Sequence, residues 1–523
     1  MEQMKKIIEG HSTKVVQIVF IEFQLVQFGL FIMQAKLMIR ERLYDQIAGQ
    51  IESRIVQGIY LAGERLPGVR RLSQEFGVSI GTVLEAQYRL QSAGRLEARA
   101  RSGYFVRAVP EAMPQLLKAK TKHLAPRLVT GQELVLQLVT ATTAPRVLQL
   151  GATVPHPDYQ PTHALARHLR AALRDHPQAI ARYEFPPGHE PLRRIIAARM
   201  ALAGCEVNPE QITITNGCQE AVTTCLSLVA KRGDVIAVES PAYFGMLQAI
   251  QLAGMKALEI NTDPEQGIDL DALQNALDKW PVKACVLSAN ASNPLGCTMS
   301  DDAKHALVKM LARHRVALIE DDAYGDLSFS QQRPKACFSY QQKHPVYYCS
   351  SFSKTICPGL RVGWIVSPQG DQQARLSKFL SNIATATVEQ VALASYLRSG
   401  AYDRHLRDRR TQYAGNAAEL LRDILEHFPL GTRASRPQGG ITIWVELPDA
   451  ANTLELAEVC LQHDIGIFPG QVFSASGRYG NCLRLSYALP YDQRVRQAVR
   501  KLATLTKQQL AAKADRTHRQ PQG

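Results

Sequence analysis

Short apolar runs separated by helix-length segments dominate residues 211–350. Five of these runs are QITIT, VIAVE, ACVLSA, VALIEDD and VYYCS, and each is long enough for one buried strand. Buried strands that alternate with helices predict a largely parallel sheet, because parallel strands need long crossover connections. In such sheets ligands bind beyond the carboxyl ends of the strands, so we expect chemistry in the residues that follow each run.

The residues that follow these runs form one chemical set. The segment NGCQEAV brings Gly217, Cys218 and Gln219 to the start of a helix, where free backbone N–H groups suit an anion. The other strand ends add an aromatic ring, an amide, a carboxylate, a phenol, two hydroxyls, an amine and a guanidinium, which are Tyr243, Asn293, Asp321, Tyr324, Ser351, Ser353, Lys354 and Arg361. Taken singly, each has a structural explanation, such as a packed tyrosine, a helix cap or a solvated lysine.

Together, these groups are what pyridoxal phosphate (PLP) requires. Its aldehyde needs an amine such as Lys354, and its ring nitrogen needs a carboxylate such as Asp321 so that the ring can withdraw electrons. Its phosphate needs hydroxyls, amides and a cation, which SSFSKTICPGLR supplies through Ser351, Ser353 and Arg361. The sequence therefore predicts a PLP site at the carboxyl edge of the sheet.

A separate, arginine-rich pattern occupies residues 38–108. Apolar residues at 43, 47, 51 and 55 predict an amphipathic helix. VRRLSQEFG and IGTVLEAQYRLQSAG predict two further helices joined by a tight turn, and RLEARARSGYFVR predicts a hairpin. The segment has eleven arginines against seven carboxylates. It fits either a DNA-binding winged helix or a small helical dimerisation module with a solvated basic face.

A family resemblance favours the winged helix. LPGVRRLS, GVSIGTV and SGYFV are similar, in this order, to the turn, recognition helix and wing of GntR-type winged helices. The resemblance implies double-stranded operator DNA as a partner, contacted by Arg70, Ser79, Thr82 and Gly103, and we add Arg101 of the hairpin turn. The family usually carries a polar or basic residue beside Thr82, where this chain has Ile80 and Gly81.

The rest of the chain resembles the fold-type I aminotransferases. The shared motifs are YEFPPG, TNGCQEA, ESPAYFG, NPLG, DDAY, SFSKTICPGLRVG and LRLSYA. The resemblance implies an α/β PLP-binding domain over 148–505, with a mainly parallel sheet, a smaller C-terminal α+β subdomain and Lys354 as the catalytic residue. It also implies that Arg484 holds the carboxylate of a substrate or effector, and that Tyr183 reaches the site of the neighbouring subunit in a homodimer.

A GntR-type winged helix joined to an aminotransferase-like domain is the architecture of MocR-type transcriptional regulators. This resemblance implies a cytoplasmic regulator with no membrane partner, whose large domain senses a small amine or amino acid. The alternative is an active aminotransferase with an attached DNA-binding domain, because a sensor that engages amines chemically needs the same lysine, aspartate and arginine. The net charge of +14 suits an anionic partner.

The remaining segments are expected to flank or connect these two domains. Residues 1–37 include an apolar run interrupted by Glu22, and we favour an extension upstream of the native start over a membrane anchor. Residues 109–147 are expected to form a partly ordered linker, and 506–523 a basic polar tail. The ten cysteines form no CxxC pair or Cys/His cluster, so no metal site is expected.

Overall fold

The computed structural model describes residues 43–55, 59–61, 63–92, 95–99, 102–106, 125–142, 144–330, 332–341, 344–368 and 372–519. The chain divides into two units, residues 1–109 and 110–523. The predicted extension at 1–37 and the predicted DNA contact of Arg101 lie outside the described residues. Within the described ranges, no helix is long and apolar enough to cross a membrane.

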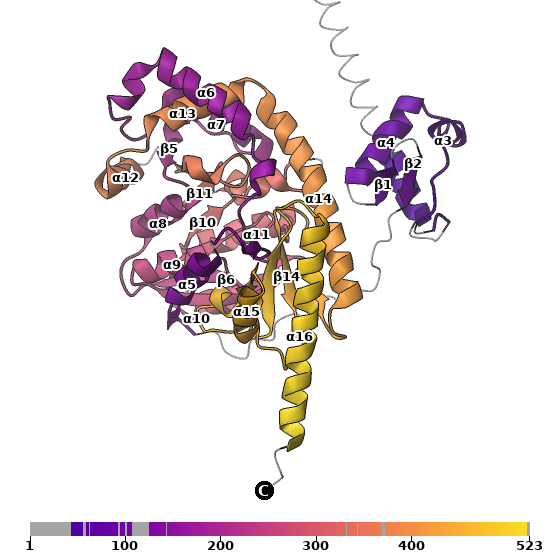
Figure 1. The fold of residues 1–523 in the computed structure, drawn as a ribbon. Helices are drawn as coiled ribbons and strands as arrows, with labels where there is room; N and C mark the ends of the chain where they lie inside the picture. Colours follow the sequence, from indigo (N-terminus) through magenta and orange to yellow (C-terminus); the bar gives the residue numbers. More distant parts are fainter. Residues whose placement is uncertain are drawn as a thin grey trace, which may run out of the picture. The chain divides into compact units, whose positions relative to one another are not determined.

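The N-terminal unit is the predicted winged helix (Figure 1). A helix covers residues 43–55, and it is followed by α3 (Val69–Phe76), α4 (Ile80–Ser92) and an antiparallel hairpin of β1 (Leu96–Arg99) and β2 (Gly103–Val106). α3 ends at Gly77, whose φ of 64° is left-handed and suits glycine, so the chain turns sharply into α4. The three helices and the hairpin share one apolar core.

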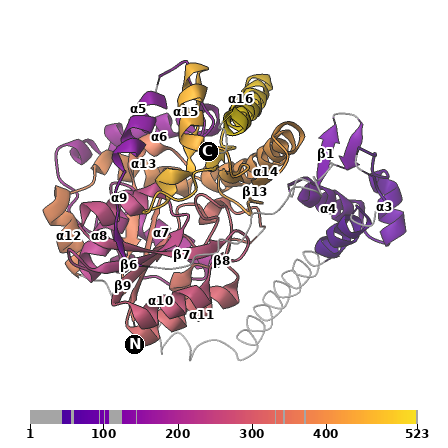
Figure 2. The same ribbon diagram turned by 90° about the horizontal axis from the view of Figure 1, so that it is seen from below.

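The large unit is built on one mixed sheet (Figures 1 and 2). Its strand order is β3-β7-β6-β9-β10-β11-β12-β5, with β8 beside β7. Strands β7, β6, β9, β10 and β11 are mutually parallel, whereas β12 is antiparallel to β11 and β5, and β3 is antiparallel to β7. The bounds are β3 Arg127–Leu128, β5 Ile212–Thr215, β6 Val235–Ser240, β7 Lys256–Asp263, β8 Gly267–Ile268, β9 Val282–Leu287, β10 Ala317–Asp321, β11 Val346–Ser351 and β12 Gly363–Val366.

Helices cover both faces of this sheet because its strands are apolar on both sides (Figure 2). Leu318 belongs to the core that includes residues of α10 (Leu270–Lys279) and α11 (Asp301–His314). Its neighbour Ile319 belongs to the second core, with α8 (Cys218–Val229) and α9 (Phe244–Leu252). Successive side chains of a strand point to opposite faces, so one apolar run supplies both cores.

A smaller antiparallel sheet forms the predicted C-terminal subdomain. Its order is β13-β14-β17-β16, with bounds Arg433–Ala434, Thr442–Glu446, Cys482–Ser486 and Phe468–Pro469. It is accompanied by α14 (Ala401–His427), α15 (Thr453–Gln462) and α16 (Gln493–Arg519), and α14 lies against α16 (Figure 1). The other described elements include β4 Leu148–Gln149, β15 Ile465–Gly466, α6 Thr162–Asp175, α7 Glu190–Met200, α12 Gln372–Asn382 and α13 Thr387–Arg398.

Two boundary predictions differ from the structure. The expected linker contains β3, which pairs with β7, and α5 (Glu133–Thr142), whose Val135 is buried in a cluster with Phe244. The described part of 109–147 is therefore integrated into the large unit, because its apolar residues complete that unit's core. The expected tail from 506 begins inside α16, where Thr506 is fully buried, and the helix continues to Arg519.

A buried ion cluster provides a test of stability. Arg333 Nη2 lies 2.7 Å from Asp322 Oδ2, and Arg333 Nε lies 2.5 Å from Asp326 Oδ1. The side chain of Asp322 is fully buried. Removing the guanidinium leaves this carboxylate buried without its cation. We therefore expect Arg333→Ala to lower the free energy of unfolding by about 3–5 kcal/mol. Urea unfolding followed by tryptophan fluorescence measures it, because all three tryptophans lie in the large unit.

The matched control for this measurement is Arg194→Ala. Arg194 pairs with Glu190 on the exposed face of α7, where an ion pair contributes about 0.3–0.5 kcal/mol. An equal decrease in the free energy of unfolding in Arg333→Ala and Arg194→Ala would contradict the expectation.

Candidate functional site

Side chains from five strand ends of the large sheet meet around one cavity of about 120 Å³. Ten of the eleven predicted cofactor residues line it, namely Cys218, Gln219, Tyr243, Asn293, Asp321, Tyr324, Ser351, Ser353, Lys354 and Arg361. The eleventh, Gly217, precedes α8 with a φ of 88°, and a Cβ added there would lie 2.5 Å from Arg361 Nη2. Any side chain at 217 would therefore displace this guanidinium.

Lys354 follows β11 and lies in the cavity. Its Nζ donates a hydrogen bond to the carbonyl oxygen of Thr153 at 2.8 Å. The pKa of this amine is lowered to about 8, mainly by burial and secondly by the nearby Arg484 guanidinium. The Asp321 carboxylate has the opposite effect and raises this pKa. The amine is therefore largely uncharged above about pH 8, and the uncharged form is the nucleophile. Thr153 escaped the sequence analysis because a backbone carbonyl carries no residue-specific signal.

Asp321 ends β10 and is held by two donors. Its Oδ1 accepts hydrogen bonds from Cys218 Sγ at 3.3 Å and from the backbone N–H of Ala323 at 3.1 Å. Burial raises the pKa of Asp321 and raises the pKa of the Cys218 thiol well above its ordinary value. The thiol therefore stays protonated and can donate, which fixes the orientation of the carboxyl group while its other oxygen can accept from a ligand.

Groups that suit an anion lie at the start of α8. Arg361 donates from Nη2 to the carbonyl oxygen of Asn216 at 2.9 Å and from Nη1 to Ser353 Oγ at 3.4 Å. It makes no ion pair with any described residue, and Ser351 is buried beside Ser353. A guanidinium, two hydroxyls and a helix N-terminus together form a site for a phosphate.

Arg484 lies on β17 and is only 1% exposed. It donates from Nε and Nη2 to the carbonyl oxygen of Gly151 and from Nη1 to Asn293 Oδ1 at 3.0 Å. Three phenylalanine rings surround the guanidinium with centroids at 4.8–5.4 Å, and these are Phe244, Phe468 and Phe473. Burial lowers its pKa to about 10. No described carboxylate forms an ion pair with it, so this buried cation lacks the anion that would offset its desolvation.

These features fit PLP together with a second anion. Tyr324 is buried, and it lines the cavity. Lys354, Arg361 and the adjacent Arg484 bring cations to the site, whereas Asp321 is the single carboxylate among the residues that line the cavity. An excess of donors and positive charge is what an anionic cofactor and an anionic ligand would balance.

Tyr183 does not join this cavity. Its side chain is 69% exposed, and its ring lies 5.6 Å from that of Phe185. An exposed aromatic pair is consistent with a role at a subunit interface, and the predicted contact with a neighbouring subunit stays a prediction.

In the winged helix, the predicted DNA contacts occupy different environments. Arg70 and Ser79 are exposed, whereas Thr82 is only 5% exposed and its Oγ1 lies 2.8 Å from Ser79 Oγ. The predicted DNA contact of Thr82 stays a prediction, but its side chain is turned away from solvent and toward Ser79 at the start of α4. Gly103 adopts a φ of 92° beside the side chain of Arg65, which the sequence analysis did not single out.

Ion pairing divides the arginines of the winged helix into two groups. Arg89 pairs with Asp45 and Arg95 with Glu52, so their charges are already compensated. In contrast, three exposed arginines make no ion pair with any described residue, and these are Arg65, Arg70 and Arg71. The uncompensated charge therefore concentrates around the start of α3 and the hairpin, which is where an anionic partner would be held.

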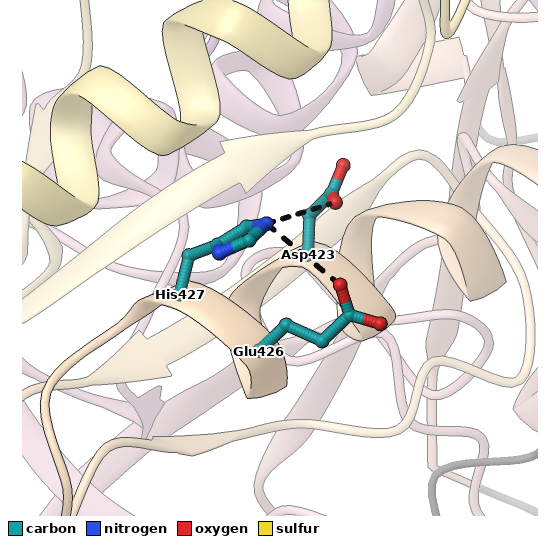
Figure 3. Close-up of side chains that lie close together, drawn as sticks. All are labelled: Asp423, Glu426 and His427. Atoms are coloured by element: carbon teal, nitrogen blue, oxygen red, sulfur yellow. Dashed lines mark ion pairs between the residues drawn. The ribbon is translucent and has the colours of Figure 1, made fainter.

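A cluster of Asp423, Glu426 and His427 on α14 has the residue types of a metal site (Figure 3). The neighbours of Asp423, however, indicate that this cluster has a structural role. Asp423 Oδ2 accepts a hydrogen bond from Tyr491 at 2.7 Å and lies 3.5 Å from Arg496 Nη1. Because cations and a phenol already approach the buried carboxylate, we assign the cluster to packing between α14 and α16.

Comparisons with known proteins agree with this geometry. Residues 147–502 match the family described as aminotransferase class I and II, and residues 43–106 match bacterial regulatory proteins of the gntR family. The chain belongs to the class I and II aminotransferases. Its cofactor is PLP, and the addition of a GntR-type winged helix to this aminotransferase domain is the MocR-type architecture.

Similar proteins include both regulators and enzymes. The uncharacterized HTH-type transcriptional regulator YjiR of Escherichia coli strain K12 is 37% identical over 459 residues, which are 88% of this chain and 97% of YjiR. The 2-aminoadipate transaminase of Thermus thermophilus is 30% identical over 379 residues, which are 72% of this chain and 94% of the transaminase. The crystal structure of LysN, an alpha-aminoadipate aminotransferase from the same organism complexed with N-(5'-phosphopyridoxyl)-L-leucine, is 29% identical with a TM-score of 0.66, covering 72% of this chain and 98% of LysN.

The lowered pKa of Lys354 predicts how cofactor capture depends on pH. The rate at which cofactor-free protein takes up added PLP should rise with pH around a midpoint near 8, because deprotonation exposes the nucleophilic amine. Absorbance of the bound cofactor follows the reaction, and Lys354→Ala supplies the blank. Because the Arg484 guanidinium helps to lower this pKa, Arg484→Gln should move the midpoint upward. A wild-type midpoint near 10.5, the ordinary lysine value, would contradict the assignment.

The division of the arginines predicts unequal effects on DNA binding. Arg70→Ala should weaken binding and reduce the salt dependence of the affinity by about one released counterion, because its charge has no internal partner. Arg95→Ala is the control, since Arg95 is held 2.7 Å from Glu52. Fluorescence anisotropy at several salt concentrations measures both variants. Equal losses of affinity and salt slope would argue against a contact through the start of α3.

Proposed function

We propose that this protein is a PLP-dependent, DNA-binding transcriptional regulator whose large domain senses an α-amino acid. The single observation that carries the choice of ligand is Arg484, a buried guanidinium with no ion-pair partner among the described residues. Lys354 and Arg484 both line a second, larger cavity of about 630 Å³. A ligand with an amine and a carboxylate on one carbon can therefore meet both groups at once.

The residues around the cofactor divide its functional groups among them. Lys354 would bond covalently to its aldehyde carbon and would hold or release a proton at Nζ. Asp321 would pair with the ring nitrogen, Tyr324 and Asn293 would donate toward the ring hydroxyl, and Tyr243 would stack on the ring. The start of α8 would hold the phosphate together with four side chains, Gln219, Ser351, Ser353 and Arg361. When bound, PLP supplies an electron sink for the amine that reacts with it.

The larger cavity also favours a particular kind of side chain. Its wall beyond Lys354 and Arg484 is mainly apolar and includes Val139, Val147, Val154 and Leu489, with Arg494 as one further cation. None of the described lining residues is Asp or Glu, so a second ammonium group would find no counter-charge. An α-amino acid with a bulky, apolar side chain is the effector that best fits these walls.

An active aminotransferase is the second candidate. It is favoured by one observation, namely that Lys354, Asp321 and Arg484 are all present and line two cavities that share Tyr243 and Lys354. The winged helix and the similarity to a regulator over nearly the whole chain support the sensor more strongly. Release of a keto acid from an effector amino acid, measured over many turnovers, separates the two candidates.

A homodimer completes the proposal. The exposed ring of Tyr183 is available to a second copy of the chain, and two winged helices would bind two half-sites of one operator. Because the partner is DNA, we place the protein in the cytoplasm.

The role of Arg484 is tested by Arg484→Gln in the PLP-loaded protein. We expect the effector to bind at least about 30-fold more weakly, because the buried carboxylate loses its charged partner. The absorbance band of the bound cofactor and the affinity for DNA alone should persist. Titration with a panel of amino acids, followed by the cofactor spectrum and by DNA binding, measures the effect.

Two further variants make this experiment decisive. Arg433→Gln on β13 of the same sheet removes an arginine that is paired with Glu446 and should leave the response intact. Arg484→Lys keeps the charge and should restore part of the response. An unchanged effector response in Arg484→Gln would show that the ligand has no carboxylate at this position.

A further inference from the structure

The solvent-facing side of α4 carries an apolar stripe. Ile80, Leu84 and Tyr88 are 47%, 45% and 45% exposed, and their spacing of four residues places them along one face of the helix. The opposite face is buried in the core of the winged helix through Val83 and Leu90. A helix at the surface of a small module normally turns polar residues outward, so the exposed Ile80 and Leu84 on this face call for an explanation.

The surroundings of the stripe favour contact with DNA. Arg65, Arg70 and Arg71 are exposed on the same module and make no ion pair with any described residue. The carboxylate of Glu85, next to Leu84, is 3.6 Å from Arg89 Nε, so it is partly compensated. An apolar protein surface would leave these arginines unsatisfied, whereas a phosphate backbone would balance them.

The position of the stripe along α4 is the one that meets bases. In helix-turn-helix modules the second helix lies in the major groove, and its N-terminal residues contact base edges. Ile80 and Leu84 lie in the first and second turns of α4, directly after the exposed Ser79. Tyr88 follows one turn later, farther from the end of the helix that approaches the bases.

The chemistry of these two side chains narrows what they can recognise. Isoleucine and leucine have no donor or acceptor, so they cannot pair with the polar edges of guanine, adenine or cytosine. The C5-methyl group of thymine is the apolar feature of the major groove. We propose that Ile80 and Leu84 contact thymine methyl groups, so that each operator half-site carries thymines where the first two turns of α4 dock.

The experiment removes the methyl groups and nothing else. The full-length protein first selects its preferred duplex from random DNA. Each thymine of that duplex is then replaced by deoxyuridine, which pairs identically but lacks the C5-methyl group. We expect the affinity to fall about fourfold for each contacted methyl group, in line with the burial of one methyl. Replacement at thymines outside the contacted positions should have no effect.

Variants assign each methyl contact to a residue. Ile80→Ser and Leu84→Gln should each abolish the deoxyuridine penalty at one thymine and relax the base preference there, while binding to phosphates persists. Both positions are exposed, so folding is not at stake. Leu61→Gln is the matched control, because Leu61 is an exposed leucine of the same module outside α4. It should keep the full penalty.

The inference rests on the DNA-binding part of the proposed function, and the outcomes separate the two. Failure to select any DNA sequence would count against the proposed function itself. Tight binding with equal affinity for thymine and deoxyuridine duplexes would overturn the inference alone. A change of oligomeric state in Ile80→Ser or Leu84→Gln, with the deoxyuridine penalty intact, would also overturn it, because the stripe would then be a protein interface.

Discussion

The buried guanidinium of Arg484 joins the parts of the large unit that must act together. It lies on the small antiparallel sheet, yet it donates to Gly151, which follows β4, and to Asn293, beyond β9 of the large sheet. The three surrounding rings exclude water from it, which makes an approaching anion attractive and the bare cation costly. Ligand affinity and the relative position of the two sheets therefore depend on the same side chain.

Much of the fold and of the cofactor site follows from the sequence. Five strands of the large sheet could be found because each is a short apolar run, and the cofactor residues because polar groups directly follow such runs. Since parallel strands align their carboxyl ends, residues more than a hundred positions apart, such as Cys218 and Asp321, converge without any further signal.

The features that escaped prediction depend on long-range packing. α5 and the end of α16 carry weak or mixed patterns on their own, and their positions are set by surfaces elsewhere in the chain, such as the cluster around Phe244. The burial of Thr82 has a different, local cause, since its hydroxyl is turned toward Ser79 at the start of α4. Ion pairing was equally hidden, because Arg70 and Arg95 look alike until Glu52 is placed beside one of them.

The hydrogen bond between Lys354 Nζ and the Thr153 carbonyl has a consequence for signalling. Thr153 belongs to the stretch that lines the larger cavity, together with Val147 and Val154. An amine nitrogen that forms a new covalent bond or loses a proton has fewer hydrogens to donate. The hydrogen bond from Lys354 to Thr153 therefore depends on the chemical state of the lysine. A chemical change at Lys354 Nζ therefore alters the hydrogen bond that restrains Thr153 in the wall of the larger cavity.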